Sequence, residues 1–198
     1  MDYYTNNAKA FVESTLHVDM QPLYQRFLPL LPERAHILDA GCGSGRDARY
    51  FIDHGYRVTA FDASAEITVL AEREIGQTVQ VQRLQEIKCQ HQFDGVWACA
   101  TLLHVPLSEL TEVFRRLHRT LKSDGVLYAS FKYGSGEHER DGRRFTDMNE
   151  TALDQLLSEL VRFSKIEVWV SEDRRPQRAT QKWLNILLRA KEGACLTA

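Results

Sequence analysis

Cysteine is scarce in this chain of 198 residues, and its placement argues against two kinds of site. The four cysteines, Cys42, Cys89, Cys99 and Cys195, form no C-x-x-C pair and share no spacing with histidine that is typical of a metal site. We therefore expect reduced thiols, with no disulfide framework and no bound metal.

Long hydrophobic runs and an excess of one charge are also missing. No apolar segment approaches the roughly 20 residues that a membrane helix needs, and the first seven residues are polar and acidic, unlike a signal peptide. We expect a cytoplasmic protein that does not cross a membrane. The net charge of −2 gives no global basic field for nucleic acid, although it does not exclude a local basic patch.

The chain does contain the residues that a globular core requires. Hydrophobic residues make up 43% and charged residues 26% of the sequence, which are ordinary globular proportions. A length of 198 residues is that of one domain with a full core, so we expect residues 1–198 to form a single domain. Strand and helix patterns alternate along the chain, which predicts an α/β fold built on a parallel sheet.

The chain is organised around residues 36–47. An apolar run ends at Asp39, and three glycines, Gly41, Gly43 and Gly45, precede a helical pattern. A buried strand therefore turns tightly into a helix N-terminus, where glycine admits a close ligand and unpaired N–H groups favour a carboxylate or phosphate. Two ligands fit this chemistry, a dinucleotide and S-adenosylmethionine (SAM).

Residue 46 separates these two ligands. The dinucleotide fingerprint needs a small residue three positions after its second glycine, and Arg46 occupies that position. Asp39 suits an ammonium group, directly or through water, better than a pyrophosphate that it would repel. At every fixed place, Asp39-Ala40-Gly41-Cys42-Gly43-Ser44-Gly45 resembles the first motif of class I SAM-dependent methyltransferases, acidic-x-Gly-x-Gly-x-Gly.

The second strand pattern, over residues 56–61, ends at Asp62. An acid at the tip of the second strand can accept hydrogen bonds from both ribose hydroxyls, which suits either cofactor. Asp62 or Ser64 could equally cap the helix expected over residues 65–74. The spacing and the strand end favour ribose binding by Asp62.

Later segments are similar to further parts of the same family. Phe93-Asp94 opens a strand over 93–100, and residues 101–106 resemble a Leu-His-His-Val segment of which only His104 is present. His104 could shape the methionine end of the pocket, act as a base near neutral pH, or be a hydrogen-bonded packing residue. The resemblance further implies that residues after the third strand, over 79–81, meet the adenine ring.

The resemblance is to ubiquinone-pathway and tellurite-resistance-type small-molecule methyltransferases, and it covers residues 36–131. It implies a Rossmann-like, seven-stranded, mostly parallel sheet with a reversed last strand and helices on both faces. The cofactor-binding residues expected from these motifs are Asp39, Gly41, Cys42, Gly43, Gly45, Arg46, Asp62, Ala63, Ser64, Leu84, Gln85, Glu86, Cys99 and Leu103.

Residues 34–131 are the expected SAM-binding core, and residues 1–33 before it are expected to form an N-terminal helical cap. Residues 1–33 carry two helical patterns, and in the resembled family such an extension commonly covers the SAM pocket. Tyr3 and Tyr4 are then candidates to close over cofactor or substrate, with Tyr4 also a candidate catalytic residue, or they are surface aromatics at a frayed end.

Residues 132–198 carry the expected substrate-side loop, helix and final β-hairpin. Residues 132–147 are polar and are predicted to form a long loop, followed by a helix capped by Asn149 and by a hairpin of strands over 163–170 and 183–189. Basic side chains at this rim could recognise an anionic acceptor or could pair with neighbouring acids. The expected substrate-side residues are Tyr3, Lys132, Tyr133, Arg140, Arg143, Arg144, Arg174, Arg175 and Arg178.

Together the motifs predict transfer of a methyl group from SAM to a small molecule, leaving S-adenosylhomocysteine. A sulfonium methyl group is already electrophilic, so in-line positioning and exclusion of water should contribute most to the rate. The chain lacks the Asn-Pro-Pro-Tyr-like segment and the Pro-Cys pair of nucleobase methyltransferases. Methylation of tRNA or other RNA is the alternative, a non-catalytic SAM-binding protein is a further one, and a nicotinamide dehydrogenase is a distant third.

Overall fold

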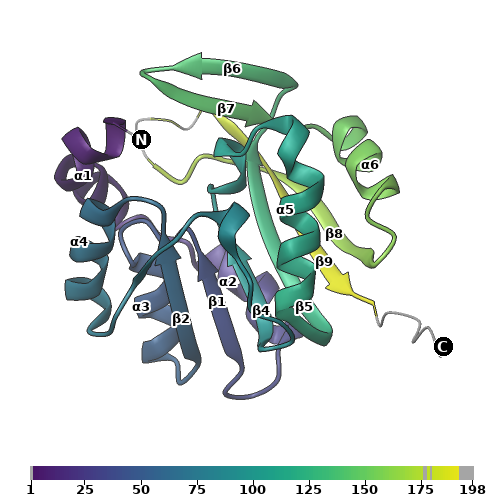
Figure 1. Ribbon diagram of the computed structural model, residues 1–198, viewed down its shortest axis with the longest axis horizontal. Coiled ribbons are helices and arrows are strands. Elements are labelled where there is room, and N and C mark those ends of the chain that lie inside the picture. Colours follow the sequence, from purple (N-terminus) through teal and green to yellow (C-terminus); the bar gives the residue numbers. More distant parts are fainter. Residues whose placement is uncertain (1, 176–177, 179, 192–198) are drawn as a thin grey trace.

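The computed structural model describes residues 2–175, 178 and 180–191, without the side chains of residues 2, 3, 5 and 6. A seven-stranded sheet runs through its centre, with helices around it (Figure 1). The sheet contains β1 (His36–Ala40), β2 (Arg57–Asp62), β3 (Gln80–Val81), β4 (Phe93–Ala98), β5 (Leu121–Lys132), β8 (Phe163–Glu172) and β9 (Lys182–Ala190).

The strand order is β3-β2-β1-β4-β5-β9-β8. The first five strands pair in parallel, whereas β9, the last strand in the chain, is antiparallel to both of its neighbours. This order confirms the predicted mostly parallel sheet with a reversed last strand. The carboxyl ends of the parallel strands therefore share one edge, where such sheets bind ligands.

Helices pack on both faces of the sheet because alternate residues of the central strands point to opposite sides. Leu38 belongs to one apolar core and its neighbour Ile37 to the other, and Val96 and Trp97 divide in the same way. The helices are α1 (Asp2–Thr15), α2 (Gln21–Phe27), α3 (Arg46–Asp53), α4 (Ala65–Ile75), α5 (Leu107–Thr120) and α6 (Glu150–Ser158), with the short turns η1 (Leu28–Leu30), η2 (Leu84–Glu86) and η3 (Leu102–His104).

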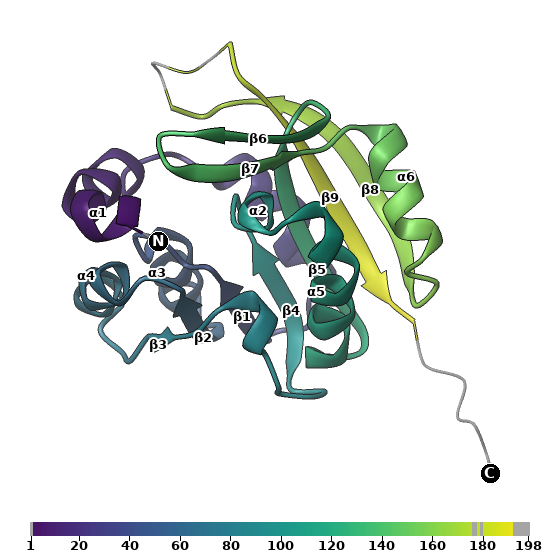
Figure 2. The same ribbon diagram turned by 45° about the horizontal axis from the view of Figure 1, so that its top comes forward.

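Each face has its own set of helices. The core around Leu38 includes apolar residues of α5 and α6, and the core around Ile37 includes residues of α2, α3 and α4. Helix α1 lies beside α4, at the sheet edge where the parallel strands end (Figures 1 and 2). The predicted N-terminal helices are thus confirmed, and α1 is placed over the ligand-binding edge.

The predicted long loop over residues 132–147 is wrong. Strands β6 (Gly136–Arg140) and β7 (Arg143–Asp147) form an antiparallel hairpin there, in a small sheet of their own. The turn is Asp141-Gly142, and both residues have positive φ, +53° and +67°. Two such residues are typical of the tight turn that joins paired strands, so the charged segment folds back on itself (Figure 2).

The start of α5 is stabilised by a residue from another element. The helix begins at Leu107, and Pro106 is its N-cap residue. The Leu107 N–H donates to Glu137 Oε1 at 3.0 Å. A carboxylate of the β6 strand therefore satisfies the first turn of the helix, which is a tertiary contact that no local pattern contains.

No helix of the described residues is long and apolar enough to cross a membrane.

Candidate functional site

A cavity of about 790 Å³ lies beyond the carboxyl ends of β1, β2, β4 and β5. Its walls come from the segment after each strand, from α1, from the β6–β7 hairpin and from the β8–β9 connection. Helix α1 and the hairpin meet above this edge of the sheet, which Figure 2 shows from above. Segments far apart in the sequence therefore enclose one space.

The three glycines of the turn after β1 differ in what surrounds them. A Cβ on Gly43, where φ is +55°, would lie 3.4 Å from the Phe11 ring, within the cavity lining. A Cβ on Gly41 would come within 2.1 Å of the Thr101 hydroxyl oxygen, and one on Gly45 within 2.9 Å of Ile75. Gly43 is thus the glycine that leaves room for a ligand, whereas the other two allow close packing.

Asp39 lies beneath the glycine turn and is 2% exposed. Its Oδ2 atom has no hydrogen-bond partner within the described part of the chain. Burial, and after it the nearby carboxylate of Asp47, raises the pKa of Asp39 well above its usual range. A cation would relieve both effects, so this carboxyl fits the α-ammonium group of SAM, directly or through water.

Asp62 connects the glycine turn with the end of β2. Its Oδ2 accepts the Gly43 N–H and its Oδ1 accepts the Ser64 N–H, both at 3.0 Å. Ser64 caps α4 by accepting the Ile67 N–H, so Asp62 is not needed as the cap. Each carboxylate oxygen has a second acceptor site, which leaves Asp62 at the cavity wall with capacity for two ribose hydroxyls.

The segment after β3 supplies an apolar wall. Leu84 and Gln85 line the cavity together with Val81, whose side chain is 60% exposed. An exposed apolar side chain beside a cavity fits a flat ring such as adenine. Glu86 is engaged elsewhere, because its carboxylate accepts the Arg83 N–H at 3.0 Å. The other predicted cofactor residues Cys42, Ala63, Ser64, Cys99 and Leu103 all line the cavity.

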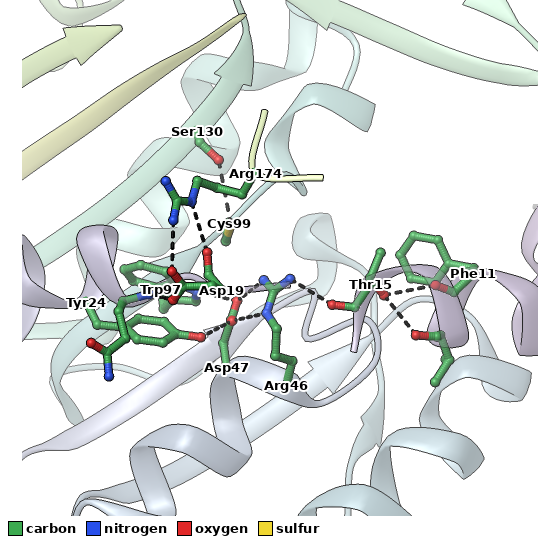
Figure 3. A network of polar contacts seen from close by, with 12 residues as sticks. Phe11, Thr15, Asp19, Tyr24, Arg46, Asp47, Trp97, Cys99, Ser130 and Arg174 are labelled. Carbon is green, nitrogen blue, oxygen red and sulfur yellow. Dashed lines mark hydrogen bonds and ion pairs between the residues drawn. The ribbon is translucent and has the colours of Figure 1, made fainter. Parts of the chain in front are cut away.

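Arg46 lines the cavity but is held in a buried ion pair (Figure 3). Its Nε and Nη2 donate to the two oxygens of Asp47, at 2.6 and 2.9 Å, and its Nη1 donates to the Thr15 carbonyl at 3.1 Å. Tyr24 Oη and Trp97 Nε1 donate to the same carboxylate. Arg46 therefore ties α1 to α3, a role that the sequence did not indicate.

This network sets the charge state of Asp47. Burial acts to raise its pKa, but the Arg46 guanidinium and the hydrogen bonds from Arg46, Tyr24 and Trp97 hold the pKa of Asp47 below its usual value. Nearby, burial raises the pKa of the Cys99 thiol to about 12. Cys99 is thus a neutral thiol at physiological pH and unsuited to nucleophilic attack.

The side of the cavity where the sequence predicts the acceptor is built around Phe145 of β7. Lys132 Nζ lies 4.3 Å from the centre of the Phe145 ring, and the Arg143 guanidinium lies 5.3 Å from it. Burial lowers the pKa of Lys132, and Arg140, Arg175 and Arg178 also lower it, against the opposing effect of Asp147. The cations here are close enough to repel one another, so an anion would stabilise the group.

Several predicted acceptor-side residues are already engaged by acids. Arg144 pairs with Glu137 at 3.3 Å, and Arg174 pairs with Asp19 at 2.8 Å (Figure 3). Arg175 binds both oxygens of Asp173. Tyr133 is 41% exposed and donates to Glu150, outside the cavity lining, and the side chain of Tyr3 lies outside the described residues.

Arg140, Arg143 and Arg178 are the other arginines of the predicted acceptor side. The first two share the exposed carboxylate of Asp141, each at 3.6 Å, beyond hydrogen-bond distance. Arg178 is exposed and lines the cavity. With Lys132, these arginines form the part of the predicted basic rim that is best placed for an added anion.

His104 and Tyr4 meet at the boundary between the two halves of the cavity. Tyr4 Oη lies 3.1 Å from His104 Nε2, and His104 Nδ1 lies 2.8 Å from the carbonyl oxygen of Arg144. Burial lowers the pKa of His104, and Arg143 and Lys132 lower it further, although the hydrogen bond to Arg144 opposes them. The imidazole is therefore neutral at pH 7.

Sequence reasoning missed a group of lining residues that carry no motif. Asn185 is 1% exposed in the apolar strand β9 and accepts the Tyr128 hydroxyl at 2.8 Å. A lone asparagine in an apolar run was a usable signal, because a buried amide needs partners. The missed lining residues with ring or hydrogen-bonding side chains include Phe11, Thr15, Thr101, Tyr128, Ser130, Phe145, Ser171, Trp183 and Asn185.

The comparisons with known proteins agree with this geometry. A family profile described as a methyltransferase domain matches residues 37–125. Malonyl-[acyl-carrier protein] O-methyltransferase of Enterobacter lignolyticus is 35% identical over 129 residues, which cover 61% of this chain and 51% of that protein. Ubiquinone biosynthesis O-methyltransferase of Xanthomonas oryzae is 31% identical over 103 residues, 48% of this chain and 42% of that protein. The matches thus span about half the length of these curated relatives.

A solved structure extends the likeness to nearly the whole chain. The 1,6-didemethyltoxoflavin-N1-methyltransferase of Burkholderia thailandensis, with bound 1,6-didemethyltoxoflavin and S-adenosylhomocysteine, has a TM-score of 0.75 and 25% identity. The superposition covers 96% of this chain and 90% of that one. The glycine turn with its acidic residues, the strand order and these matches agree: residues 37–125 match a methyltransferase domain, and the chain has the fold of class I SAM-dependent methyltransferases.

Proposed function

We propose that this chain transfers a methyl group from SAM to a small-molecule acceptor. The observation that carries the proposal is the single cavity that joins the glycine turn and Asp62 on one side to Lys132 and Arg143 on the other. One continuous space of about 790 Å³ lies within the range of small-molecule sites. The toxoflavin methyltransferase, which binds a small acceptor beside the cofactor product, supports this reading.

The cofactor half would hold SAM through the residues that fit its parts. Asp39 would balance the ammonium group, Asp62 would bind the ribose, and Leu84 with Val81 would pack on the adenine. When bound, SAM supplies an electrophilic methyl group. The protein contributes orientation, and α1 and the hairpin exclude water from the space between the two halves.

The acceptor class follows from the charge of the second half. Lys132, Arg140, Arg143 and Arg178 all line this side of the cavity, and Arg140 and Arg143 lie near the same exposed carboxylate, so the acceptor of our proposal carries a carboxylate, phosphate or similar anion. The aromatic ring of Phe145 orders two of these cations, which reduces the entropy that anion binding would otherwise cost.

The first experiment is incubation with methyl-labelled SAM and a cell extract, followed by separation of small molecules, RNA and protein. The proposal expects label among the small molecules, and expects Asp62→Ala to abolish it. Asp53→Ala is the matched control, since Asp53 pairs with Arg49 on the exposed side of α3. Label in RNA would replace the small-molecule acceptor with a nucleic acid, and no label despite SAM binding would contradict catalysis.

A second experiment tests the anionic acceptor. Lys132→Met and Arg143→Met should each raise the extract concentration needed for half-maximal labelling by about tenfold, because each removes one charge-assisted contact. Arg49→Met, at an exposed pair on α3, is the control and should leave that concentration unchanged. If the first two variants behave like the control, the acceptor is not held as an anion.

A further inference from the structure

The hydrogen bonds of His104 fix its tautomer. The carbonyl oxygen of Arg144 can only accept a hydrogen bond, so His104 Nδ1, at 2.8 Å, must carry the proton and donate it. In the neutral ring Nε2 is then unprotonated. Tyr4 Oη, at 3.1 Å from Nε2, must be the donor of that second bond. At the cavity wall, a tyrosine hydroxyl therefore donates a hydrogen bond to an unprotonated ring nitrogen.

Three separate elements build this arrangement. Tyr4 comes from α1, His104 from η3 after β4, and the Arg144 carbonyl from β7, while the Phe145 ring lies 5.0 Å from the imidazole, between ring centres. Both Tyr4 and His104 line the cavity. Such a pair forms only when α1 and the hairpin are both in place over the edge of the sheet.

We propose that Tyr4 and His104 remove the proton of the acceptor during methyl transfer, so that the methylated atom is the oxygen of an O–H group or the nitrogen of an N–H group. This inference rests on the proposed function and narrows its acceptor class. In this proposal Tyr4 is the catalytic residue of the pair, because it lines the cavity and its hydroxyl exchanges a proton with the acceptor. His104 is a positioning residue and the final proton acceptor.

The proton balance of the step is simple. The acceptor atom gains a methyl group and loses its proton, while the electron pair of the broken carbon–sulfur bond stays on sulfur. The acceptor proton passes to Tyr4 Oη as the tyrosine's own proton moves to His104 Nε2. The positive charge lost by the sulfonium thus reappears on the imidazole, which releases its proton to solvent before the next turnover.

The groups around His104 favour brief protonation of its ring over a lasting positive charge. Arg143 from β7 and Lys132 from β5 face the ring, and each disfavours a lasting positive charge there. Tyr4 and the Arg144 carbonyl complete its polar contacts. The ring is consequently neutral before the reaction and returns its proton quickly afterwards.

Two substitutions distinguish proton transfer by this pair from a purely structural contact that holds α1 in place. Tyr4→Phe keeps the ring beside Phe11, 5.2 Å away, but removes the hydroxyl. His104→Gln can still accept a hydrogen bond from Tyr4 but cannot take up its proton. Tyr50→Phe, on α3 and outside the cavity lining, is the matched control for loss of a tyrosine hydroxyl.

The probe is methyl-labelled SAM with the small-molecule fraction of a cell extract, and SAM affinity is measured by calorimetry. Tyr4→Phe and His104→Gln should each lower the labelling rate by about 100-fold while SAM affinity changes less than twofold. Because the pKa of His104 is lowered, the wild-type rate should fall only at a pH below the ordinary pKa of histidine, and His104→Gln should lack this acid limb.

Each contrary result has a distinct meaning. Labelling by His104→Gln at the wild-type rate would show that hydrogen-bond acceptance suffices, and would overturn the proton role while leaving methyl transfer intact. Loss of SAM affinity in both variants would overturn it in favour of a structural contact. No labelling by the wild type would overturn the proposed function itself.

The tautomer can be tested without any acceptor. Nitrogen NMR of the ¹⁵N-histidine-labelled protein, with the His104 signals assigned by their absence in His104→Gln, should show a proton on Nδ1 and none on Nε2 at pH 7.5. A proton on Nε2 would overturn the inference whatever the activity measurements show.

Discussion

Gly43 and Gly45 show how one residue type serves two purposes within a single turn. Both have positive φ, +55° and +80°, which an L side chain rarely adopts. A Cβ on Gly43 would enter the cavity beside Phe11, whereas a Cβ on Gly45 would lie 2.9 Å from Ile75 in the contact between α3 and α4. Gly43 therefore matters for ligand binding, and Gly45 matters for the packing of the fold.

We therefore predict different losses for two alanine variants. Gly43→Ala should weaken SAM binding at least tenfold with a stability loss of only about 1–2 kcal/mol, the cost of the left-handed backbone. Gly45→Ala should lose about 2–4 kcal/mol by adding the same strain to a packing clash, while its folded fraction keeps normal SAM affinity. Calorimetry and urea unfolding measure the two quantities, and equal loss of affinity in both variants would contradict the assignment.

The buried pair of Arg46 and Asp47 yields a prediction about stability and pH. Asp47→Asn would leave the guanidinium without its charge partner, so the free energy of unfolding should fall by about 3–5 kcal/mol. Asp53→Asn removes an exposed pair with Arg49 and should cost no more than about 0.5 kcal/mol.

The pH dependence of this effect has a definite sign. The pKa of Asp47 lies below its usual value near 3.8, so its stabilisation is present above that pH and is lost as the pH falls through the lowered pKa. The difference between wild type and Asp47→Asn should be constant from pH 5 to 7 and shrink below pH 4. A difference that grows on acidification would contradict it.

The elements differ in how far local sequence determined them. The glycine turn and the apolar strands of the core could be predicted from sequence. Strand β1 and its turn contain both the apolar pattern and the ligand-binding residues within about a dozen positions. Strand β6 could not be predicted in this way, since all five of its residues are exposed and no apolar alternation marks it. The Asp141-Gly142 turn was the available signal for this hairpin.

Local sequence also could not identify the ion-pair partners of the basic residues. Arg174 and Asp19 are 155 positions apart, and their pairing depends on how the α1–α2 connection and the β8–β9 connection meet. The sequence could therefore predict a basic rim but not which arginines were already engaged. The same reasoning explains the missed role of Arg46, whose contact with the Thr15 carbonyl needs α1 in place.

At the scale of elements, a buried threonine hydroxyl attaches the hairpin to the rest of the site. Thr146 of β7 donates to the Val105 carbonyl, just after η3, at 2.8 Å. Thr146→Val should cost about 1–2 kcal/mol, speed amide exchange in β7, and lower the labelling of the acceptor several-fold without changing SAM affinity.

The control for this variant is Thr120→Val. Thr120 is buried at the end of α5 and donates to the Leu117 carbonyl at 2.7 Å. It therefore makes a similar buried hydrogen bond, but within α5 and not to the hairpin. It should show a similar loss of stability with normal labelling. Equal losses of labelling in both variants would mean that global stability, and not the position of the hairpin, controls acceptor binding.

At the scale of the whole molecule, the cofactor site links most of the domain. The segments after β1, β2, β3 and β4 and helix α1 all line the cavity, so a ligand there contacts parts of the chain that separate on unfolding. Ligand that binds only the folded state stabilises it by RT ln(1 + [L]/Kd), which is about 2.7 kcal/mol at 100 times Kd.

We predict that SAM raises the thermal midpoint by about 5–10 °C at that concentration, because a domain of this size shifts about 2–4 °C per kcal/mol. Asp62→Ala should abolish the shift and Asp53→Asn should retain it. NADH should give none, since Arg46 fills the position where a dinucleotide needs a small residue. A shift with NADH equal to that with SAM would contradict the cofactor assignment, whereas a shift with SAM alone that Asp62→Ala retains would remove Asp62 from the site.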